Sequence, residues 1–397
     1  MLSQHKRYWA EISLDAAENN FRVIKERIKP ETKLCCVVKA DAYGHGAVCL
    51  ARLYEKLGAD YFAVSNIEEA LQLRKNNIKH PIMILGYTPF ECAKLLADND
   101  IEQSVYSYDY AEKLNEFAET AGVKVKIHLK LDSGMSRIGF CCKHGEKDNL
   151  ELDMAAKACG LEHLIPHGVF THFAVADEGN DGREYTLNQF KQFSYAIEYL
   201  QQKHRITFQI RHCANSGAIF DYPEVQLDMV RAGIVLYGCA PSGKVDCQGL
   251  RSVMSLKAVV SMVKKLVPGD CVSYGCTYRA DSEIILATIP VGYADGFWRS
   301  NFNKATFIIK GKKVQLAGRV CMDQLMIDVS SIPDVMAGDE VIIMGEENGE
   351  KISASDIGDL NHTINYEILC AVGKRVPRYY IKNGETIDVK SDIISCS

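Results

Sequence analysis

The sequence predicts an α/β protein with an N-terminal parallel (β/α)8 barrel and a smaller C-terminal, mainly β domain. Short apolar runs alternate with helical patterns in roughly the first 240 residues, which is the usual size of such a barrel. After Pro241, β-like runs follow one another at short intervals with turn signals between them. The total length of 397 residues is also more than one ordinary core supports, so two domains are expected.

The barrel prediction rests on eight short apolar runs rich in β-branched residues, which suit strands covered on both faces. These runs cover residues 34–38, 61–64, 82–85, 102–105, 123–131, 168–171, 208–210 and 225–230. Helical patterns occupy residues 15–28, 47–57, 66–76, 89–97, 108–121, 149–159, 184–203 and 215–220. Repeated strand–helix units imply parallel strands joined by right-handed crossovers. A doubly wound open sheet is the alternative, but no GxGxxG motif follows the first strand.

We place the domain boundary so that residues 1–243 form the barrel and residues 244–397 form the β domain. The second domain contains strand-like runs such as 256–263 and 340–344, and turn signals such as Pro268-Gly269-Asp270. Residues 8–13 read as a further strand that lies outside the eight-fold pattern. We expect this strand to pair with the C-terminal sheet.

Composition excludes several classes of protein. A net charge of -5 without any basic run argues against nucleic-acid binding. No apolar stretch is long enough to span a bilayer, and the first residues lack the apolar core of a secretory signal. The 15 cysteines are odd in number, scattered and without a CxxC pair, so we expect reduced thiols in a cytoplasmic protein and no metal site.

Residues 37–46, Val-Val-Lys-Ala-Asp-Ala-Tyr-Gly-His-Gly, are the most distinctive stretch of the chain. Lys39 stands where the first strand leaves the core. Partial desolvation there would lower its pKa and free its amine to form a Schiff base. The structural alternative is a lysine that only extends from a strand end into water.

Polar residues recur at the carboxyl ends of five predicted strands, where a (β/α)8 barrel places its active site. They are Lys39, Lys130, Asp132, Arg137, His172, His212, Asn215, Ser216 and Arg231. Any one of them could be structural, but the recurrence indicates a common site. Residues 213–217 and 231–234 follow the seventh and eighth strands, and both offer backbone N–H groups for a phosphate. A phosphate seat together with an imine-forming lysine points to pyridoxal phosphate.

Nine motifs, in order along nearly the whole chain, resemble those of alanine racemases. They cover residues 38–46, 130–139, 171–174, 214–216, 229–234, 272–275, 292–296, 319–323 and 364–367. The resemblance implies a bacterial enzyme that interconverts L-alanine and D-alanine with pyridoxal 5'-phosphate and supplies D-alanine for peptidoglycan. It also implies a head-to-tail homodimer of chains that each carry a barrel and a β domain.

The resemblance further implies roles for individual residues. Lys39 would bind the cofactor covalently and act as the base for the D-enantiomer. Tyr274, supplied to the active site by the partner subunit, would be the base for the L-enantiomer. Because tyrosine has a pKa of about 10, nearby cations must lower it, and we expect His172 with Arg231 to act as the relay.

Other matched positions would bind cofactor or substrate. Those expected at the cofactor phosphate are Tyr43, Ser216, Gly233, Ile234 and Tyr366. Arg231 would face the pyridine nitrogen, and Arg137 would face the ring hydroxyl and the substrate carboxylate. Substrate would be contacted by Met322 with its neighbours Cys321 and Asp323, while Lys130 matches a position that is carbamylated in many members. The substrate corridor would contain Asp177, Tyr293, Arg299, Arg319 and Ile364, unless these only form a solvated rim.

Three alternatives remain open on the sequence. A serine racemase, or an alanine/serine racemase, of the same family is the nearest one, because an apolar pocket rejects an added hydroxyl only weakly. A decarboxylase on a related fold would place an acid opposite the pyridine nitrogen, where this chain has Arg231. A non-catalytic cofactor-binding barrel would lack the C-terminal domain.

Overall fold

The computed structural model describes residues 6–393 and divides into two compact units. The barrel unit comprises residues 18–42 and 47–250, and the β unit comprises residues 6–17, 43–46 and 251–393. The division in the second half of the chain therefore falls between Leu250 and Arg251.

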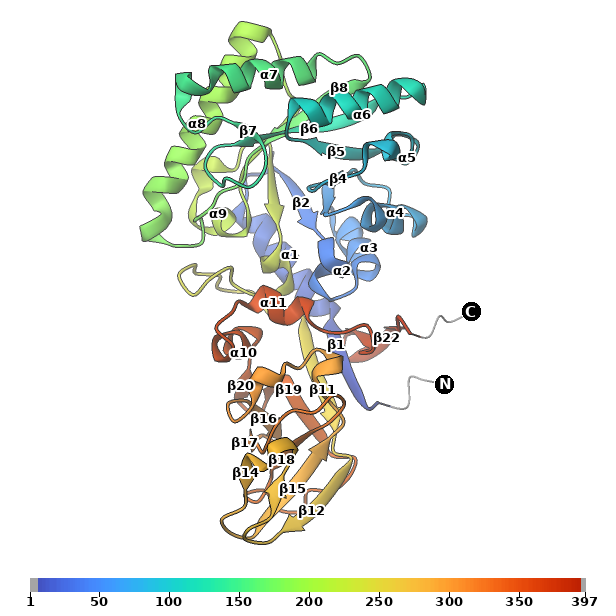
Figure 1. Ribbon diagram of the computed structural model, residues 1–397, viewed down its shortest axis with the longest axis vertical. Helices are drawn as coiled ribbons and strands as arrows, with labels where there is room; N and C mark the ends of the chain where they lie inside the picture. The colour runs from blue at the N-terminus through green and yellow to red at the C-terminus, as the bar shows by residue number, and fades with distance from the viewer. Residues whose placement is uncertain (1–5, 394–397) are drawn as a thin grey trace. The chain divides into compact units, whose positions relative to one another are not determined.

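The barrel unit is a ring of eight parallel strands, which confirms the predicted fold class (Figure 1). In the order in which they pair, the strands are β10 (Met229–Ala232), β2 (Lys33–Val37), β3 (Tyr61–Val64), β4 (Ile82–Ile84), β5 (Ile101–Val105), β6 (Val125–Asp132), β8 (Leu164–Phe170) and β9 (Ile210–His212). The ring is nearly closed, because Asp228 N–H donates to the Arg211 carbonyl and Arg231 N–H donates to the Ala214 carbonyl. The short β7 (Phe140–Cys141) pairs with the end of β6.

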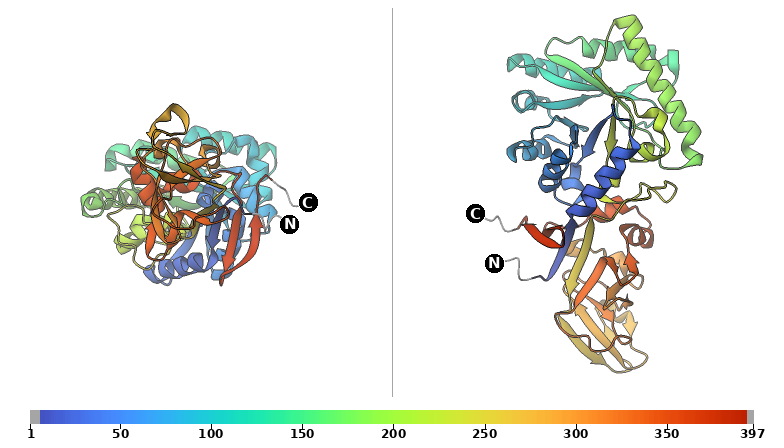
Figure 2. Two further views of the ribbon diagram at one scale, coloured as in Figure 1. Left: turned by 90° about the horizontal axis from the view of Figure 1, so that it is seen from below. Right: turned by 180° about the vertical axis from the view of Figure 1, so that it is seen from behind.

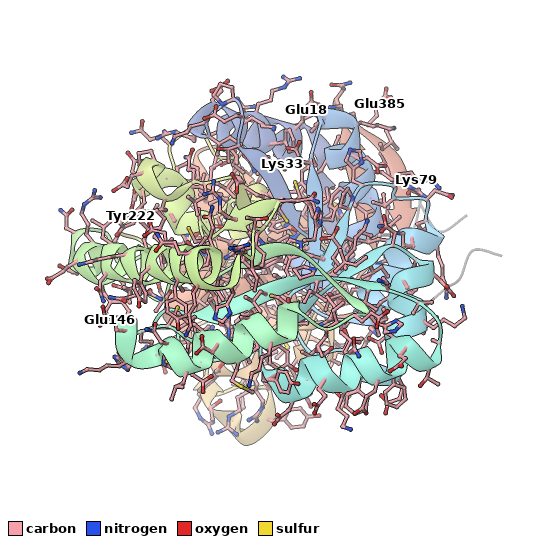
Figure 3. All side chains as sticks on the ribbon, turned by 90° about the horizontal axis from the view of Figure 1, so that it is seen from above. Glu18, Lys33, Lys79, Glu146, Tyr222 and Glu385 are labelled. Carbon is pink, nitrogen blue, oxygen red and sulfur yellow. The ribbon has the colours of Figure 1, made fainter. Side chains whose placement is uncertain are left out.

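Helices cover the outside of these strands, as the view along the ring shows, with Lys79 and Glu146 at its outer edge (Figure 3). The helices are α3 (Ala47–Leu57), α4 (Ile67–Lys75), α5 (Ala93–Asp98), α6 (Tyr108–Thr120), α7 (Asn149–Cys159), α8 (Asn180–His204) and α9 (Ser216–Asp221), with α1 (Leu14–Arg27) before the first barrel strand. Side chains cap several of them; Asn66, for example, accepts from Glu69 N–H at 3.0 Å.

Two departures from the expected helices have clear causes. Helix α8 begins at Asn180, earlier than residue 184, and Gly182 lies inside it. A Cβ at Gly182 would lie 2.0 Å from the Val175 carbonyl oxygen, so this glycine permits close packing and does not break the helix. The helix expected at 89–97 starts with a 3-10 turn at Phe90–Cys92, before α5.

The β unit is built on a long sheet that includes the N-terminal strand. Strand β1 (Tyr8–Ser13) pairs antiparallel with β11 (Met254–Val259) and parallel with β21 (Arg378–Lys382). Figure 2 shows β1, in blue, beside these yellow and red strands. The sheet also contains β12 (Met262–Leu266), β15 (Ile284–Ile289), β16 (Thr306–Ile309), β17 (Lys312–Leu316), β18 (Leu325–Asp328), β19 (Glu340–Glu347), β20 (Glu350–Ile352) and β22 (Glu385–Lys390).

Smaller elements complete the β unit. Strands β13 (Cys271–Val272) and β14 (Tyr278–Arg279) form a separate hairpin, and α10 (Ala354–Leu360) and α11 (Asn365–Cys370) follow β20. Each unit has its own apolar core, with Leu34 and Phe62 fully buried in the barrel unit and Trp9 and Phe307 fully buried in the β unit. The cysteines of residues 6–393 are all free. Within the same range, no helix combines the length and the hydrophobicity needed to cross a membrane.

Candidate active site

Lys39 lies at the carboxyl end of β2, at the start of an unusual turn. Ala40, Asp41, Ala42 and Tyr43 all have φ between 52° and 55°, in the left-handed region that side chains normally disfavour. Hydrogen bonds hold this turn in place: Asp41 Oδ1 accepts from Ala47 N–H at 2.8 Å, and Ala42 N–H donates to the Val38 carbonyl at 2.9 Å. Strained backbone of this kind persists only where the surroundings impose it, and it is concentrated at functional sites.

The barrel unit brings the cations of three strand ends, those of β2, β6 and β10, together around His172, which follows β8. Removal from water lowers the pKa of His172 well below its ordinary value, and the charges of Arg231, Arg137, Lys130 and Lys39 lower it further, in that order. His172 is therefore neutral at neutral pH. The charges of the same four side chains therefore act on one imidazole, and the barrel unit concentrates positive charge at this end.

Arg231, near the end of β10, is fixed by several hydrogen bonds to its guanidinium. Its guanidinium donates to His212 Nδ1 at 2.8 Å and to the Thr171 and Cys213 carbonyls at 2.8 and 3.2 Å, and it lies 3.3 Å from His172 Nδ1. Burial lowers the pKa of Arg231 to about 10. The side chain is therefore a fixed cation at neutral pH.

Lys130, on β6, is a buried amine. Its Nζ donates to the Leu131 carbonyl at 2.7 Å and lies 5.3 Å from the centre of the Phe170 ring. Burial, followed by the charge of Arg231, lowers the pKa of Lys130 to about 7. A large share of this amine is therefore unprotonated at neutral pH.

Arg137 is exposed on the loop that follows β6. Asp132 shapes that loop, because its Oδ1 accepts from Gly134 N–H at 3.0 Å and from Ser136 N–H at 2.9 Å. The carboxylate thus holds the backbone of the segment that precedes Arg137 in place.

The phosphate-binding residues expected in the barrel unit lie together. Gly233 N–H donates to Ser216 Oγ at 3.0 Å, which joins the start of α9 to the segment after β10. Asn215 caps the same helix by accepting from Ala218 N–H at 3.1 Å. Gly217 packs against the Ala176 carbonyl so closely that a Cβ would lie 2.6 Å from its oxygen. Ile234 follows directly at the start of a 3-10 turn.

The β unit brings the two expected phosphate-binding tyrosines together. Tyr43 and Tyr366 have ring centres 5.9 Å apart, and Tyr366 lies in α11. Gly44 allows this approach, since a Cβ there would lie 2.4 Å from the Leu369 carbonyl oxygen. The Gly44 carbonyl in turn accepts from Arg378 Nε at 3.1 Å.

The β unit also gathers the residues expected to reach the substrate of the partner subunit. Tyr274, Cys321, Met322 and Asp323 line a common cavity of about 510 Å3. Tyr274 is 66% exposed and Met322 is 54% exposed. Among the expected corridor residues, Tyr293 N–H donates to the Cys321 carbonyl at 3.1 Å.

The other residues expected in the substrate corridor lie on several different segments. The Arg319 carbonyl accepts from Ser273 Oγ at 2.7 Å, which ties it to the segment of Tyr274. Arg299 lies in a 3-10 turn at Arg299–Asn301, and Ile364 is 59% exposed. Asp177 belongs to the barrel unit, where its carbonyl accepts from Ser242 Oγ and burial raises the pKa of its carboxyl. That these residues form a substrate corridor stays a prediction.

Two family descriptions match this chain: "Alanine racemase, N-terminal domain" over residues 12–241 and "Alanine racemase, C-terminal domain" over residues 253–380. The chain belongs to the alanine racemase family. It is 46% identical over 385 residues to alanine racemase 1 of Clostridium acetobutylicum, covering 96% of this chain and 97% of the relative. The alanine racemase of Desulfovibrio desulfuricans is 44% identical over 387 residues, covering 96% of this chain and all of the relative.

Solved structures of alanine racemases agree over almost the whole length. The alanine racemase of Clostridium difficile 630 superposes with a TM-score of 0.91 at 41% identity, covering 98% of this chain and 99% of that one. The Bacillus anthracis enzyme with bound L-Ala-P gives a TM-score of 0.91 at 34% identity, covering 98% of both chains. The resemblance and the fold class that the sequence predicted are therefore confirmed.

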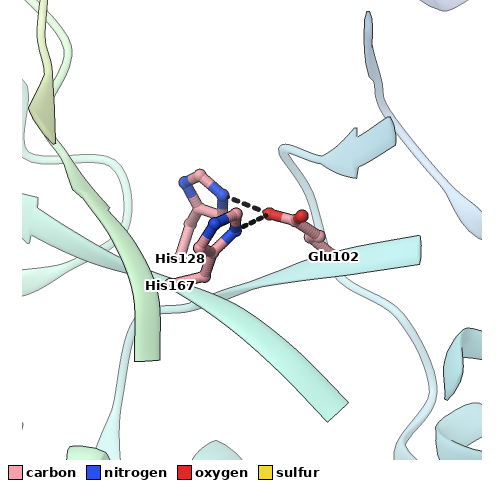
Figure 4. A group of neighbouring side chains, drawn as sticks. All are labelled: Glu102, His128 and His167. Atoms are coloured by element: carbon pink, nitrogen blue, oxygen red, sulfur yellow. Dashed lines mark hydrogen bonds and ion pairs between the residues drawn. The ribbon is translucent and has the colours of Figure 1, made fainter. Parts of the chain in front are cut away.

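The sequence did not lead us to predict one group of interacting side chains. Glu102, His128 and His167 meet inside the barrel unit, where Glu102 Oε2 lies 2.5 Å from His128 Nε2 and 2.9 Å from His167 Nδ1 (Figure 4). Their mutual distances are also compatible with a metal ion, as are those of a second group, Cys141, His144 and Asp148. The available signal was polar side chains within the runs 101–105 and 125–132, where a strand buried on both faces should be apolar.

Proposed function

We propose that the chain is an alanine racemase that interconverts L-alanine and D-alanine with pyridoxal 5'-phosphate as cofactor, and so supplies D-alanine for peptidoglycan. The observation that carries this proposal is the gathering of Lys39, Lys130, Arg137 and Arg231 around His172. Such a cluster suits a cofactor that presents a carbonyl, a phosphate and a ring hydroxyl at once.

The residues present fit that cofactor. Lys39 would supply the amine that binds its carbonyl carbon, and Arg231 would present N–H donors to its ring nitrogen. For the phosphate, the barrel unit offers the Ser216 hydroxyl and the Gly233 and Ile234 backbone, which are already joined at 3.0 Å between Ser216 and Gly233. Tyr43 and Tyr366, whose rings lie together in the β unit, are the further phosphate ligands that the resemblance implies.

Pyridoxal phosphate, when bound, supplies a conjugated ring that stabilises negative charge at the substrate α-carbon. Racemisation then requires proton removal from one face and proton return to the other, so two bases on opposite faces are needed. Lys39 would move the proton for the D-enantiomer, and Tyr274 would move it for the L-enantiomer. A neutral His172, held beside Arg231, can accept a hydrogen bond and pass the influence of the cation to Tyr274.

The charge state of Arg231 determines whether the pyridine nitrogen of the cofactor would be protonated. Since burial lowers its pKa only to about 10, Arg231 stays protonated at neutral pH. Its guanidinium can therefore only donate hydrogen bonds and cannot accept one. The ring nitrogen facing it would therefore stay unprotonated. A less electron-poor ring favours simple proton return over side reactions such as transamination.

Lys130 is suited to carbamylation because its pKa of about 7 leaves much of the amine unprotonated. The nitrogen of the unprotonated amine would attack the carbon of CO2 and release one proton, which gives a carbamate anion in place of a neutral amine. That anion would sit among the cations of the cluster and hold Arg137, which would then contact the ring hydroxyl and the substrate carboxylate.

We infer a homodimer in which each active site uses Tyr274 of the other chain. In support, the β unit exposes several large apolar or aromatic side chains on the segments that carry the expected substrate contacts. These are Tyr274, Tyr293, Met322 and Ile364. Exposed groups of this kind commonly mark a surface that another chain covers.

Alanine is favoured over serine because each relative compared above carries the name alanine racemase. Met322, with Cys321 and Asp323 beside it, would crowd any larger side chain. The direct test is to incubate the purified protein, loaded with pyridoxal phosphate, with L-alanine or with L-serine and to follow optical rotation. Rapid loss with L-alanine and slow loss with L-serine supports the proposal, and the opposite order would establish the serine racemase.

A further inference from the structure

A line of hydrogen bonds runs through the barrel unit from the active-site cluster to a buried carboxylate. It starts at Arg231 on β10, which donates to His212 Nδ1 on β9 at 2.8 Å. His212 Nε2 lies 2.9 Å from His128 Nδ1 on β6. His128 Nε2 then lies 2.5 Å from Glu102 Oε2 on β5, the last pair being drawn in Figure 4. The side chains along the line are buried.

The positions of the protons along this line follow from its first member. A guanidinium has only donors, so His212 Nδ1 must accept. A neutral His212 then carries its proton on Nε2 and donates to His128 Nδ1. His128 must in turn carry its proton on Nε2 and donate it to Glu102. Each imidazole is held in one tautomer, and the line has a positive group at one end and a negative group at the other.

Arg231 needs such a distant counter-charge because its direct partners are neutral. The hydrogen-bond partners that the described structure gives it are two imidazole nitrogens and two carbonyl oxygens. A buried cation without an opposite charge is costly. The two imidazoles connect Arg231 to Glu102 and polarise in the low dielectric of the interior, so the carboxylate acts on the guanidinium across the barrel.

Glu102 is held as an anion at the other end. Burial raises its pKa, but hydrogen bonds from His128 and His167 outweigh burial and lower the pKa well below its ordinary value. Tyr61 on β3 adds a third donor, its hydroxyl lying 2.8 Å from Glu102 Oε1. His167 on β8 is partly exposed, and its hydrogen bond to Glu102 raises its pKa.

The same three side chains could be read as a metal site, and the proton positions argue against that reading. Metal bound to His128 Nε2 would force the proton of this ring onto Nδ1. That proton would then point at the proton on His212 Nε2, and the link to Arg231 would break. A bound metal and the hydrogen-bonded line are therefore mutually exclusive, and the 2.5 Å contact between His128 and Glu102 favours the line.

We propose that Glu102 and His128 are positioning residues for racemisation, which hold Arg231 protonated and correctly oriented through His212. The consequence for catalysis rests on the proposed function, because it depends on Arg231 facing the ring nitrogen of the cofactor. The existence of the line does not depend on that function and can be tested in the protein without cofactor.

The first measurement is NMR of the full-length protein labelled with 15N-histidine, without cofactor, since 15N shifts report which ring nitrogen carries the proton. In the unsubstituted protein, His128 and His212 should both be Nε2–H tautomers. Glu102→Gln and Arg231→Lys should each change the signals of His128 as well as those of the neighbouring ring. The matched control is Glu55→Gln: Glu55 also pairs with a histidine, His80, at 2.7 Å, but without a link to Arg231.

The second measurement compares the loaded enzymes. Glu102→Gln keeps the shape of the side chain and removes its charge. It should lower kcat roughly ten- to hundredfold, as loss of an orienting partner of a functional group commonly does, with a smaller change in KM. The pH dependence of kcat and of the absorbance of bound cofactor should also shift. Glu102→Asp should restore part of the loss, and Glu55→Gln should change neither property.

The pH readout is specific only if the surrounding groups are known. The titratable or charged side chains next to the line are Tyr61, His167, Lys130, His172, Cys35, Cys213 and Arg137. The variant Tyr61→Phe removes a donor to Glu102 without altering its charge. It should therefore cause a smaller shift than Glu102→Gln.

The outcomes separate the proposals. Unchanged His128 signals in Arg231→Lys, or a kcat profile in Glu102→Gln identical to that of the unsubstituted enzyme, would overturn the positioning role. Stoichiometric binding of Zn2+ to the holoenzyme that is lost in His167→Ala would also overturn it, in favour of a metal site. An unsubstituted protein that neither binds pyridoxal phosphate nor racemises alanine would instead defeat the proposed function and leave the NMR result standing.

Discussion

The buried amine of Lys130 lies in the field of the Arg231 guanidinium, and burial together with this neighbouring cation lowers the pKa of Lys130 to about 7. The folded protein therefore binds fewer protons at this lysine than the unfolded chain does between about pH 7 and the ordinary lysine pKa of about 10.4. Stability should rise with pH across this window, and the gain should be lost as pH falls through it.

In CO2-free buffer, where Lys130 is a free amine, Lys130→Met should remove this pH dependence. The difference in the free energy of unfolding between the unsubstituted protein and the variant should change by up to about 5 kcal/mol across the window, with the unsubstituted protein gaining as pH rises. Urea denaturation at a series of pH values measures it. A constant difference in that buffer would contradict the lowered pKa of the Lys130 amine.

Carbamylation itself predicts dependence on CO2. Protein prepared in CO2-free buffer should lose racemase activity, and bicarbonate should restore it, because the anion that holds Arg137 forms and dissociates reversibly. A 13C NMR signal from protein incubated with 13C-bicarbonate should disappear in Lys130→Met. Full activity without CO2, together with no carbamate signal, would refute the modification.

Sharing of active sites between chains predicts complementation. Lys39→Ala and Tyr274→Phe should each lower kcat by roughly a hundred- to ten-thousandfold, the usual contribution of a positioned acid–base group. After the two inactive variants are mixed and allowed to exchange subunits, half of the dimers should be mixed and each should hold one intact site. About a quarter of full activity should therefore return. No recovery despite proven subunit exchange would place Tyr274 in the site of its own chain.

The charge opposite the ring nitrogen predicts the reaction profile. Arg231→Glu would place an acid there, favour a protonated and more electron-poor ring, and raise transamination relative to racemisation. Pyruvate formation measured against D-alanine formation tests this. Arg231→Lys serves as the control that keeps a cation, and an unchanged ratio in Arg231→Glu would contradict the role assigned to Arg231.

Gly44 supports the pairing of Tyr43 with Tyr366, and its replacement should weaken cofactor binding. In Gly44→Ala, both the positive φ of 82° and the clash with the Leu369 carbonyl oxygen must be relieved. Gly58→Ala is a matched control, since Gly58 has a φ of 91° but nothing within 4 Å of its Cβ position. Both should lose roughly 1 kcal/mol of stability from backbone strain. Only Gly44→Ala should also raise the Kd for pyridoxal phosphate, as followed by absorbance.

Much of the barrel could be predicted because its strands are covered on both faces and therefore read as apolar runs. The same fact made the active-site end visible, since Lys39, His172 and Arg231 stand out as polar residues where such runs stop. The roles of Tyr274 and Met322 came only from resemblance, because these residues would act in another subunit, and they stay predictions.

Other features carried little or no local signal. Nothing in Ala40-Asp41-Ala42 indicates a left-handed turn, since alanine favours the right-handed helix and the turn is imposed by contacts such as Asp41 with Ala47. Glu102 and His128 looked like ordinary breaks in strand patterns. Their connection to Arg231 exists only because strands β5, β6, β9 and β10 surround one interior, which only the folded barrel shows.

The most direct test of a two-base racemisation is the deuterium content of each enantiomer while L-alanine is converted in D2O. Early in the reaction, the D-alanine formed should carry deuterium at its α-carbon, because its proton is returned by a second, solvent-equilibrated base, while the remaining L-alanine should still carry hydrogen. D-alanine that retains the original α-hydrogen, or exchange in L-alanine without formation of D-alanine, would contradict it.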